Sequence, residues 1–317
     1  MTRLDFTPIG LGLALVGLLG LGILLPEWAV NLVALSLANG MVVLGLMIMM
    51  RAGLVSFGQG LYYGLGGYAA AMTATLYGIT DIFVLMLAGA VVSGGIALIL
   101  GFLMARYRGI FFAMLSMAFS MILYGVLVKS AALGSTDGFG VAPPTFLGFT
   151  AAGSEARLTF TLYGLICVLA VGIAAATHRY LNSTMGFIGE AIRENEVRVE
   201  YLGTSVKRAI HVKYVISAAI SGLGGVLTAL LVGHVTPEDF TYWTRSGEFV
   251  FVAILAGTGN VAAPFLGSLL FELVRTYALE YAPEQWQMLL GFTLLMVIMF
   301  LPEGLWSVGR LLRGGRP

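Results

Sequence analysis

Charge is scarce in this sequence of 317 residues, since only 10% of them are Asp, Glu, Lys or Arg. Soluble domains contain about 25% charged residues and roughly 45–50% apolar residues. Here 59% of the residues are hydrophobic and the mean hydropathy is +0.94, more apolar surface than one water-soluble core can bury. The composition therefore excludes an ordinary soluble domain, and the net charge of +1 gives no indication of nucleic-acid binding.

Side chains that carry out chemistry are also scarce. The single cysteine, Cys167, lies in an apolar run, where a small buried hydrophobe is the expected role. The three histidines, His178, His211 and His234, are far apart, so we expect no metal site. No hydrolytic constellation and no GxxxxGK[ST] phosphate loop occur. The sequence thus predicts no enzyme, no catalytic residues and no cofactor on this chain.

Long apolar runs stand where charge is missing. They are about 20 residues long, the length that a helix needs to cross a hydrocarbon core of about 30 Å. We predict an all-α, polytopic membrane protein that forms a single domain over residues 1–317. A shorter apolar segment, 247–257, is expected either to cross as a tenth span or to enter as a short or re-entrant helix. The nine other spans are predicted near 9–25, 29–50, 54–77, 82–105, 109–128, 159–178, 213–233, 261–280 and 285–303.

The basic residues predict the orientation of these spans. With ten segments, both termini lie on one side of the membrane. Of the basic residues, only Lys129, Arg157 and Arg245 fall on the opposite side, and Arg275 lies within a span. By the positive-inside rule, the N- and C-termini and the loop 179–212 are cytoplasmic, and the loop 129–158 is periplasmic. The residues on the cytoplasmic side are Arg3, Arg51, Arg106, Arg108, Arg179, Arg193, Arg198, Lys207, Arg208, Lys213, Arg310, Arg313 and Arg316.

The loop 179–212 contains the most charged stretch of the chain, GEAIRENEVRVEYLG. Six of the eleven residues from Glu190 to Glu200 are charged. We predict a short helix over 186–202, supported by a Glu194–Arg198 pair four residues apart and ended by Gly203. Two interpretations stay open from the residues alone: a solvated connector, or a helix that docks into a cytosolic partner. The apolar residues between the charges favour docking.

The same region resembles the permeases of ABC importers for branched-chain amino acids, in the LivM branch. The matching residues are Ala191, Ile192, Arg193, Glu194, Asn195, Leu202, Gly203, the run Ser221 to Gly225, Pro237 and Phe240. Four more stretches, AGLVSFGQGLYYGLGGYAAA, RYRGIFFAMLSMAFS, GSTDGFG and ILAGTGNVAAPFLGSLL, resemble family segments in the family's order, so the resemblance covers about residues 30–305. The chain departs from the family at Gln59, where His is common, and at Ala256 and Ala263, where glycines are usual.

The resemblance implies a permease subunit in the bacterial inner membrane. Its implied partners are a homologous second permease (LivH-like), two ATP-binding subunits that hold ATP and Mg, and an external solute-binding protein. The implied cargo is a branched-chain or other aliphatic amino acid, with urea, short amides and small aromatic or dicarboxylic acids as alternatives. The implied coupling helix, which seats in the ATP-binding subunit, consists of Glu190, Ala191, Ile192, Arg193, Glu194, Asn195, Glu196, Leu202 and Gly203.

Two glycine-rich breaks in apolar surroundings are candidates for the translocation path. The stretch 53–68 contains six glycines in sixteen residues, and close helix packing is the alternative explanation. The stretch 255–264 is the second break and predicts a junction between half-helices. The candidate path residues are Ser56, Gly58, Gln59 and Gly60 in the first break and Gly257, Gly259 and Asn260 in the second.

Ionisable residues within a span are expensive and mark a further candidate. Glu272 and Arg275 lie three residues apart in the span 261–280, where we expect an ion pair between them, with a gating or solute contact as the alternative. An ion-coupled secondary carrier that works alone would need such a mid-span carboxylate or an internal repeat, and Glu272 is the clear candidate. A membrane-embedded enzyme would need clustered His, Asp or Glu residues, and the sequence shows no such cluster.

Overall fold

The computed structural model describes residues 7–146, 155–300 and 304–306. Helices dominate, and the only strands in these residues are two short ones, β1 (Phe139–Gly140) and β2 (His234–Val235), which pair antiparallel. The helices are α1 (Thr7–Leu24), α2 (Glu27–Met50), α3 (Gln59–Tyr77), α4 (Ile82–Met104), α5 (Gly109–Lys129), α6 (Glu155–Leu181), α7 (Thr184–Tyr201), α8 (Val206–Val232), α9 (Pro237–Thr241), α10 (Trp243–Ala256), α11 (Ala263–Tyr281) and α12 (Trp286–Phe300).

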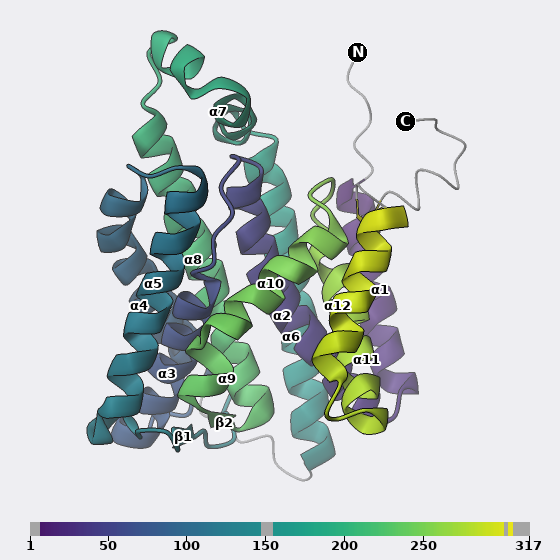
Figure 1. Cartoon of the computed structure of the whole chain (residues 1–317). Coiled ribbons are helices and arrows are strands. Elements are labelled where there is room, and N and C mark those ends of the chain that lie inside the picture. The colour runs from purple at the N-terminus through teal and green to yellow at the C-terminus, as the bar shows by residue number, and fades with distance from the viewer. Residues whose placement is uncertain (1–6, 147–154, 301–303, 307–317) are drawn as a thin grey trace.

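The helices run between two ends of the molecule (Figure 1). We call them the α7 end, where α7 lies, and the hairpin end, where β1 and β2 pair. Leu11 of α1 packs near Leu44 of α2, and the Leu305 amide donates to the Leu255 carbonyl at the end of α10. The start of α1 and Leu305, which follows α12, therefore both lie at the α7 end. This agrees with the ten predicted crossings, while the termini themselves, with Arg3, Arg310, Arg313 and Arg316, lie outside the described residues.

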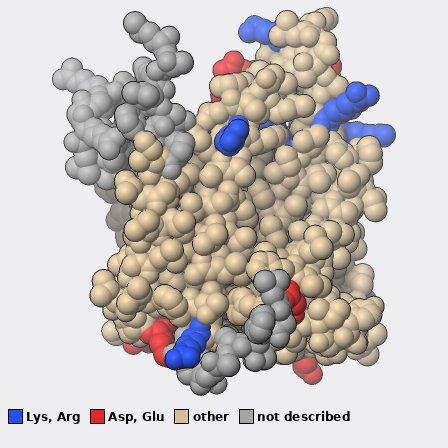
Figure 2. Space-filling model, turned by 180° about the vertical axis from the view of Figure 1, so that it is seen from behind, with Lys and Arg blue, Asp and Glu red and all other residues tan. Residues whose placement is uncertain are grey.

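The outer surface suits a lipid bilayer. Within the described residues, five helices, α2, α4, α5, α6 and α8, are long and apolar enough to cross a membrane. Large apolar side chains are exposed along α4 and α5, among them Leu98, Phe102, Ile110 and Phe111. Seen from behind, charged residues gather at the two ends and leave an uncharged band between them (Figure 2). The structure thus confirms the predicted polytopic helical membrane protein.

Close helix contacts explain much of the glycine content. A Cβ atom on Gly66 of α3 would lie 2.0 Å from the carbonyl oxygen of Gly222 on α8, and one on Gly225 would lie 1.9 Å from the carbonyl oxygen of Tyr63. Small residues let helix backbones approach in this way. Helices α2 and α8 form the buried centre, against which α3, α4, α6 and α11 pack.

The predicted span 54–77 is wrong at its start, because α3 begins only at Gln59. Helix α2 ends in a Schellman motif: the Leu54 amide donates to Met49 and the Gly53 amide to Met50, with Gly53 at φ +76°. The chain then runs as an irregular segment before α3 starts. Leu54, Ser56 and Gly58 are buried along this segment.

The predicted segment 247–257 belongs to a longer broken crossing. The short helix α9 follows β2 at the hairpin end, and α10 then runs tilted to the α7 end (Figure 1). With 14 residues α10 is about 21 Å long, too short to cross alone. The segment therefore does reach the α7 end, as part of α10 in a crossing that α9 and α10 make together. In the predicted loop 129–158, residues 131–133 form a 3-10 turn and 139–140 form β1, whereas 147–154 lie outside the described residues.

Candidate functional site

Helix α7 is attached to the body through Arg51, the residue that follows α2. The Arg51 guanidinium lies 3.4 Å from the Glu190 carboxylate of α7. It also donates to the carbonyl oxygens of Thr258 (3.1 Å) and Gly259 (3.4 Å) in the loop between α10 and α11. Burial lowers the pKa of Arg51, and the Glu190 carboxylate opposes that shift. One side chain thus connects α2, α7 and the α10–α11 loop.

Two further contacts hold α7 against the body. Arg108, before α5, donates to the Glu196 carboxylate at 2.7 Å. The buried Lys213 of α8 donates to the Met185 carbonyl at 2.9 Å, and its ammonium fills the space beside Gly189, where a Cβ would lie 2.7 Å from Nζ. Together with Arg51, these contacts tie α7 to the end of α2, the start of α5 and to α8. A displacement of α7 therefore acts on all three helices.

The predicted single helix over 186–202 is wrong at Asn195. This residue has φ −162° and ψ 100°, so α7 consists of two helical pieces. The Asn195 side-chain oxygen accepts from the Arg198 amide at 3.0 Å and caps the second piece. Because the break separates Glu194 from Arg198, their expected ion pair is not among those of the described residues. Asn has a high preference for such N-cap positions, and that was the signal in the sequence for a break.

Helix α7 also exposes large apolar side chains. Ile192 and Val199 are buried against the body, whereas Phe187, Val197, Tyr201 and Leu202 are 58%, 56%, 87% and 80% exposed. We call these four side chains the outward face of α7. The charged residues Glu194, Arg198 and Glu200 are exposed beside it. Helix α7 projects beyond the ends of the other helices in Figure 1.

The first group of predicted path residues lies at the start of α3. Ser56 and Gln59 are buried. Gln59 donates to the Ser217 hydroxyl (3.1 Å) and accepts from Ser221 (2.6 Å), both on α8. The Gly60 amide donates to the Ser246 hydroxyl of α10 at 2.9 Å. In this conformation the group, including Gly58, contacts neighbouring helices, and its role as a path stays a prediction.

The second group lies elsewhere. Gly257 ends α10 at φ +81°, the Gly259 carbonyl accepts from Arg51, and the Asn260 side chain accepts from the Ala262 amide at 2.9 Å. These residues lie at the α7 end, next to the helix that was predicted to couple. The two groups of candidate path residues thus have different partners: the first contacts α8 and α10, and the second contacts Arg51.

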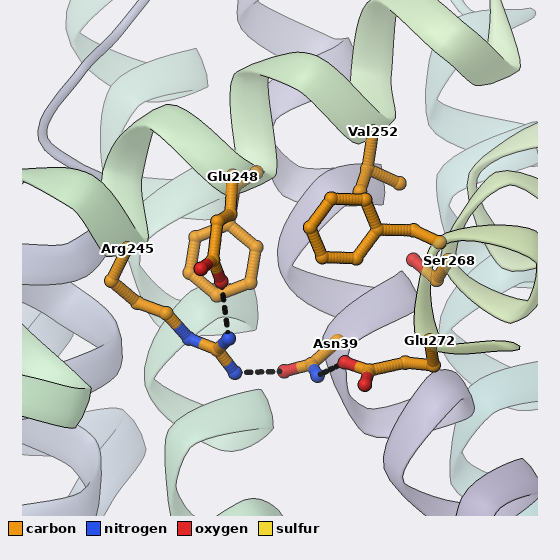
Figure 3. A pocket seen from close by; sticks show the side chains of 8 residues that line it. Asn39, Arg245, Glu248, Val252, Ser268 and Glu272 are labelled. Atoms are coloured by element: carbon orange, nitrogen blue, oxygen red, sulfur yellow. Dashed lines mark hydrogen bonds and ion pairs between the residues drawn. The ribbon is translucent and has the colours of Figure 1, made fainter. Parts of the chain in front are cut away.

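A buried polar cluster joins α2, α10 and α11 (Figure 3). Arg245 of α10 donates to Glu248 (2.6 Å) and to the Asn39 side-chain oxygen (3.2 Å), and the Asn39 amide donates to Glu272 of α11 (2.8 Å). Asn39 lies near the middle of α2, so the cluster lies near mid-depth. Arg275 completes it at 3.7 Å from Glu248.

This cluster corrects two predictions. Arg245, expected on the outer side, is buried within the body, because the Glu248 carboxylate compensates its charge there and the Asn39 side-chain oxygen accepts a hydrogen bond from it. The expected Glu272–Arg275 pair is wrong, since Glu272 binds Asn39 and Arg275 lies beside Glu248. Asn39 was missed, although an Asn inside a long apolar run is itself a signal. Within the described residues, no group of three or more His, Cys, Asp or Glu could hold a metal ion.

Comparisons with known proteins point to one family. The family model described as "Branched-chain amino acid transport system / permease component" matches residues 28–299. The permease LivM of Escherichia coli K12 is 28% identical, with 98% of this chain and 78% of that protein covered. LivM of Salmonella typhimurium is 30% identical over 82% of this chain and 65% of its own length. LivH of the same organism is 25% identical over 80% of this chain and 85% of its own. No solved structure matches the chain.

Proposed function

Because the chain belongs to the family of branched-chain amino acid transport system permease components, we propose that it is the transmembrane subunit through which an ATP-driven importer moves branched-chain or other aliphatic amino acids. The relatives LivM and LivH are named as permeases of high-affinity branched-chain amino acid transport systems. By analogy, this chain pairs with a LivH-like permease, two ATP-binding subunits that hold ATP and Mg, and a solute-binding protein. The complex lies in the bacterial inner membrane.

One observation carries the proposal: α7 presents an apolar outward face while its other side is bound to the body. Phe187, Val197, Tyr201 and Leu202 are exposed to at least half of their surface, and an apolar patch rimmed by charges is typical of a protein interface. We assign this face to the ATP-binding subunit and the α7 end to the cytoplasm, in agreement with the excess of Lys and Arg there.

The contacts of α7 suggest how ATP hydrolysis drives transport. Motion of the ATP-binding subunits would displace α7, and the displacement would pass through Glu190 to Arg51 and the α10–α11 loop. A second connection runs through Glu196 and Arg108 to α5. Alternating access requires an element with two positions, and both the ATP-binding subunits and the bound solute must shift the equilibrium between them. Glu190 and Glu196 would then transmit motion within this chain, while the outward face contacts the partner.

The test is co-purification and uptake in the complete importer. Leu202→Asp should weaken co-purification of the ATP-binding subunits and abolish ATP-driven leucine uptake, because a carboxylate would replace an apolar contact. Lys207→Asp, an exposed position outside the outward face, is the control. Normal uptake by the Leu202→Asp importer would refute the proposed docking. Competition of labelled leucine with urea, short amides and dicarboxylic acids would identify the cargo.

A second experiment separates this function from an ion-coupled carrier that works alone. The buried Glu272 is the carboxylate that such a carrier would use. The purified chain by itself, in liposomes with a proton or sodium gradient, should accumulate no amino acid. Gradient-driven uptake would instead support the carrier.

A further inference from the structure

A large cavity opens at the hairpin end and reaches the buried polar cluster. Its volume is about 650 Å³, within the range of roughly 300–1,000 Å³ that small-molecule sites occupy. Its mouth is lined by His234, Glu238 and Tyr242, and its floor by Arg245 and Glu272. A solute that enters from the hairpin end thus meets charged groups near mid-depth.

The floor of the cavity contains both signs of charge. Arg245 and Arg275 supply two guanidinium groups, and Glu248 and Glu272 supply two carboxylates. Their formal charges cancel. A ligand with net charge would leave an uncompensated charge at this depth, which is costly in a low-dielectric interior. The floor therefore favours a ligand whose own charges cancel, while Glu238 and Asp239 add two carboxylates nearer the mouth of the cavity.

The cluster keeps unused hydrogen-bonding capacity. Arg245 is 9% exposed, yet within the described residues its Nε has no hydrogen-bond partner. The first carboxylate oxygen of Glu272 accepts from Asn39, and the described residues supply no donor to the second. A buried guanidinium N–H without an acceptor is rare. A small cavity of about 10 Å³ beside the cluster, about the size of a single water, is lined by the same Arg245 and Glu272 and by Ser268, whose hydroxyl has no partner within the described residues (Figure 3).

Apolar walls complete the site. Leu35 of α2, Val232 of α8, Leu279 of α11 and Trp286 of α12 line the same cavity. They offer a surface for an aliphatic side chain beside the charged floor. Phe249 and Phe271 are buried beside Arg245 and Glu272.

We propose that this cavity is the site at which the permease binds a zwitterionic α-amino acid. Its floor consists of Arg245, Glu248, Glu272 and Arg275. The guanidinium groups receive the ligand carboxylate, the glutamates receive its ammonium group, and the apolar walls receive its aliphatic side chain. Charge-assisted hydrogen bonds of both kinds favour a zwitterion over a neutral amide of similar size. The inference rests on the proposed function and adds a binding site to it.

The first arm of the test fills the cavity without altering the charged cluster. Leu279→Trp places an indole at the cavity wall, and Leu98→Trp, at a half-exposed leucine of α4 away from the cavity, is the matched control. In the complete importer in proteoliposomes, Leu279→Trp should lower ATP-driven leucine uptake by about tenfold or more, while Leu98→Trp leaves it unchanged. Co-purification of all subunits establishes that both variants assemble. Equal uptake by the two variants would overturn the inference.

The second arm measures occupancy directly. The single native cysteine is buried, so Thr276→Cys, on the α11 wall, offers a thiol in the cavity, and Glu280→Cys on the same helix lies outside it. Leucine should slow the labelling of Thr276→Cys by a charged thiol reagent and leave Glu280→Cys unchanged. Isovalerate, isopentylamine and isovaleramide, which keep the aliphatic chain but each lack one or both charges, should protect much less. Equal protection by any of them, or none by leucine, would overturn the zwitterion site.

Leucine uptake by the unaltered importer distinguishes failure of the proposed site from failure of the proposed function. If it takes up leucine while Leu279→Trp does so equally and Thr276→Cys is not protected, the site is wrong and the proposed function stands. If the unaltered importer takes up no amino acid, the proposed function is wrong whatever the variants do.

Discussion

Arg51 and Glu190, 139 residues apart in the sequence, meet at 3.4 Å where α2 ends and α7 passes over it. The same guanidinium holds the Thr258 carbonyl of the α10–α11 loop. Helix α10 carries Arg245 and Glu248, which line the floor of the cavity. One arginine therefore lies between the helix proposed to dock the ATP-binding subunit and the helix that lines the proposed solute site.

We predict that Arg51→Gln uncouples transport. The variant loses the ion pair to Glu190 and the bonds to two carbonyls, so motion of α7 no longer reaches the α10–α11 loop. ATP-driven uptake in proteoliposomes should fall strongly while the subunits still co-purify. Arg106→Gln, at an exposed arginine near the same end, should behave as the unaltered protein. Unchanged uptake by Arg51→Gln would show that coupling takes another route.

The cap at Asn195 predicts a second effect. Asn195→Ala removes the acceptor for the Arg198 amide, at a cost of about 1 kcal/mol, and Ala favours a continuous helix. Hydrogen exchange at the Arg198 amide should become faster if the second helical piece frays. Asn195→Ser, which preserves a capping oxygen, should retain slow exchange and uptake. Identical exchange in the two variants would rule out the capping role.

Close packing predicts a large effect at one glycine. Gly66→Ala forces a Cβ to within 2.0 Å of the Gly222 carbonyl oxygen, so α3 and α8 must separate. Overpacking of this kind costs about 1–3 kcal/mol or more, and the apparent melting temperature in detergent should drop. Gly95→Ala in α4, where a Cβ meets nothing within 4 Å, should raise it slightly or leave it unchanged. A Gly66→Ala variant as stable as Gly95→Ala would contradict the contact.

Gln59 connects α3 to α8 through two serines. Gln59→Leu leaves the hydroxyls of Ser217 and Ser221 without this partner in a buried site, at a cost of about 1–3 kcal/mol. A double-mutant cycle with Ser217→Ala, followed by thermal unfolding, should give a clear coupling energy. Additive effects of the two substitutions would mean that the hydrogen bond contributes nothing. Normal uptake by a stable double variant would indicate that Gln59 has a structural role, whereas lost uptake would indicate that it contacts the solute.

Much of the membrane architecture could be predicted from local pattern. The apolar run 82–105 became α4 (Ile82–Met104) and the run 109–128 became α5 (Gly109–Lys129). A span must satisfy its backbone hydrogen bonds internally, so an apolar run of sufficient length has to be helical. The residue pattern around Glu190 to Gly203 likewise indicates the family through the order of its residues alone.

The contacts of charged residues within the body were harder to predict. Glu272 and Arg275 lie close in sequence, yet Glu272 binds Asn39 and Arg275 lies beside Glu248. Sequence spacing shows which pairs are close on one helix but not which partner a neighbouring helix provides. The break at Asn195 and the late start of α3 were missed for a related reason. Both depend on caps and buried contacts that compete with helix propensity.

The sequence by itself determined that this chain is a multi-pass helical permease, because apolar runs of membrane length and a family pattern depend only on the order of residues. Only the tertiary structure decided which charges meet. It placed Arg51 between α7 and the α10–α11 loop, and it gathered Asn39, Arg245, Glu248 and Glu272 into one buried polar cluster. The physical reason is that a buried charge needs a compensating partner, and in a helical bundle several helices far apart in sequence can supply it.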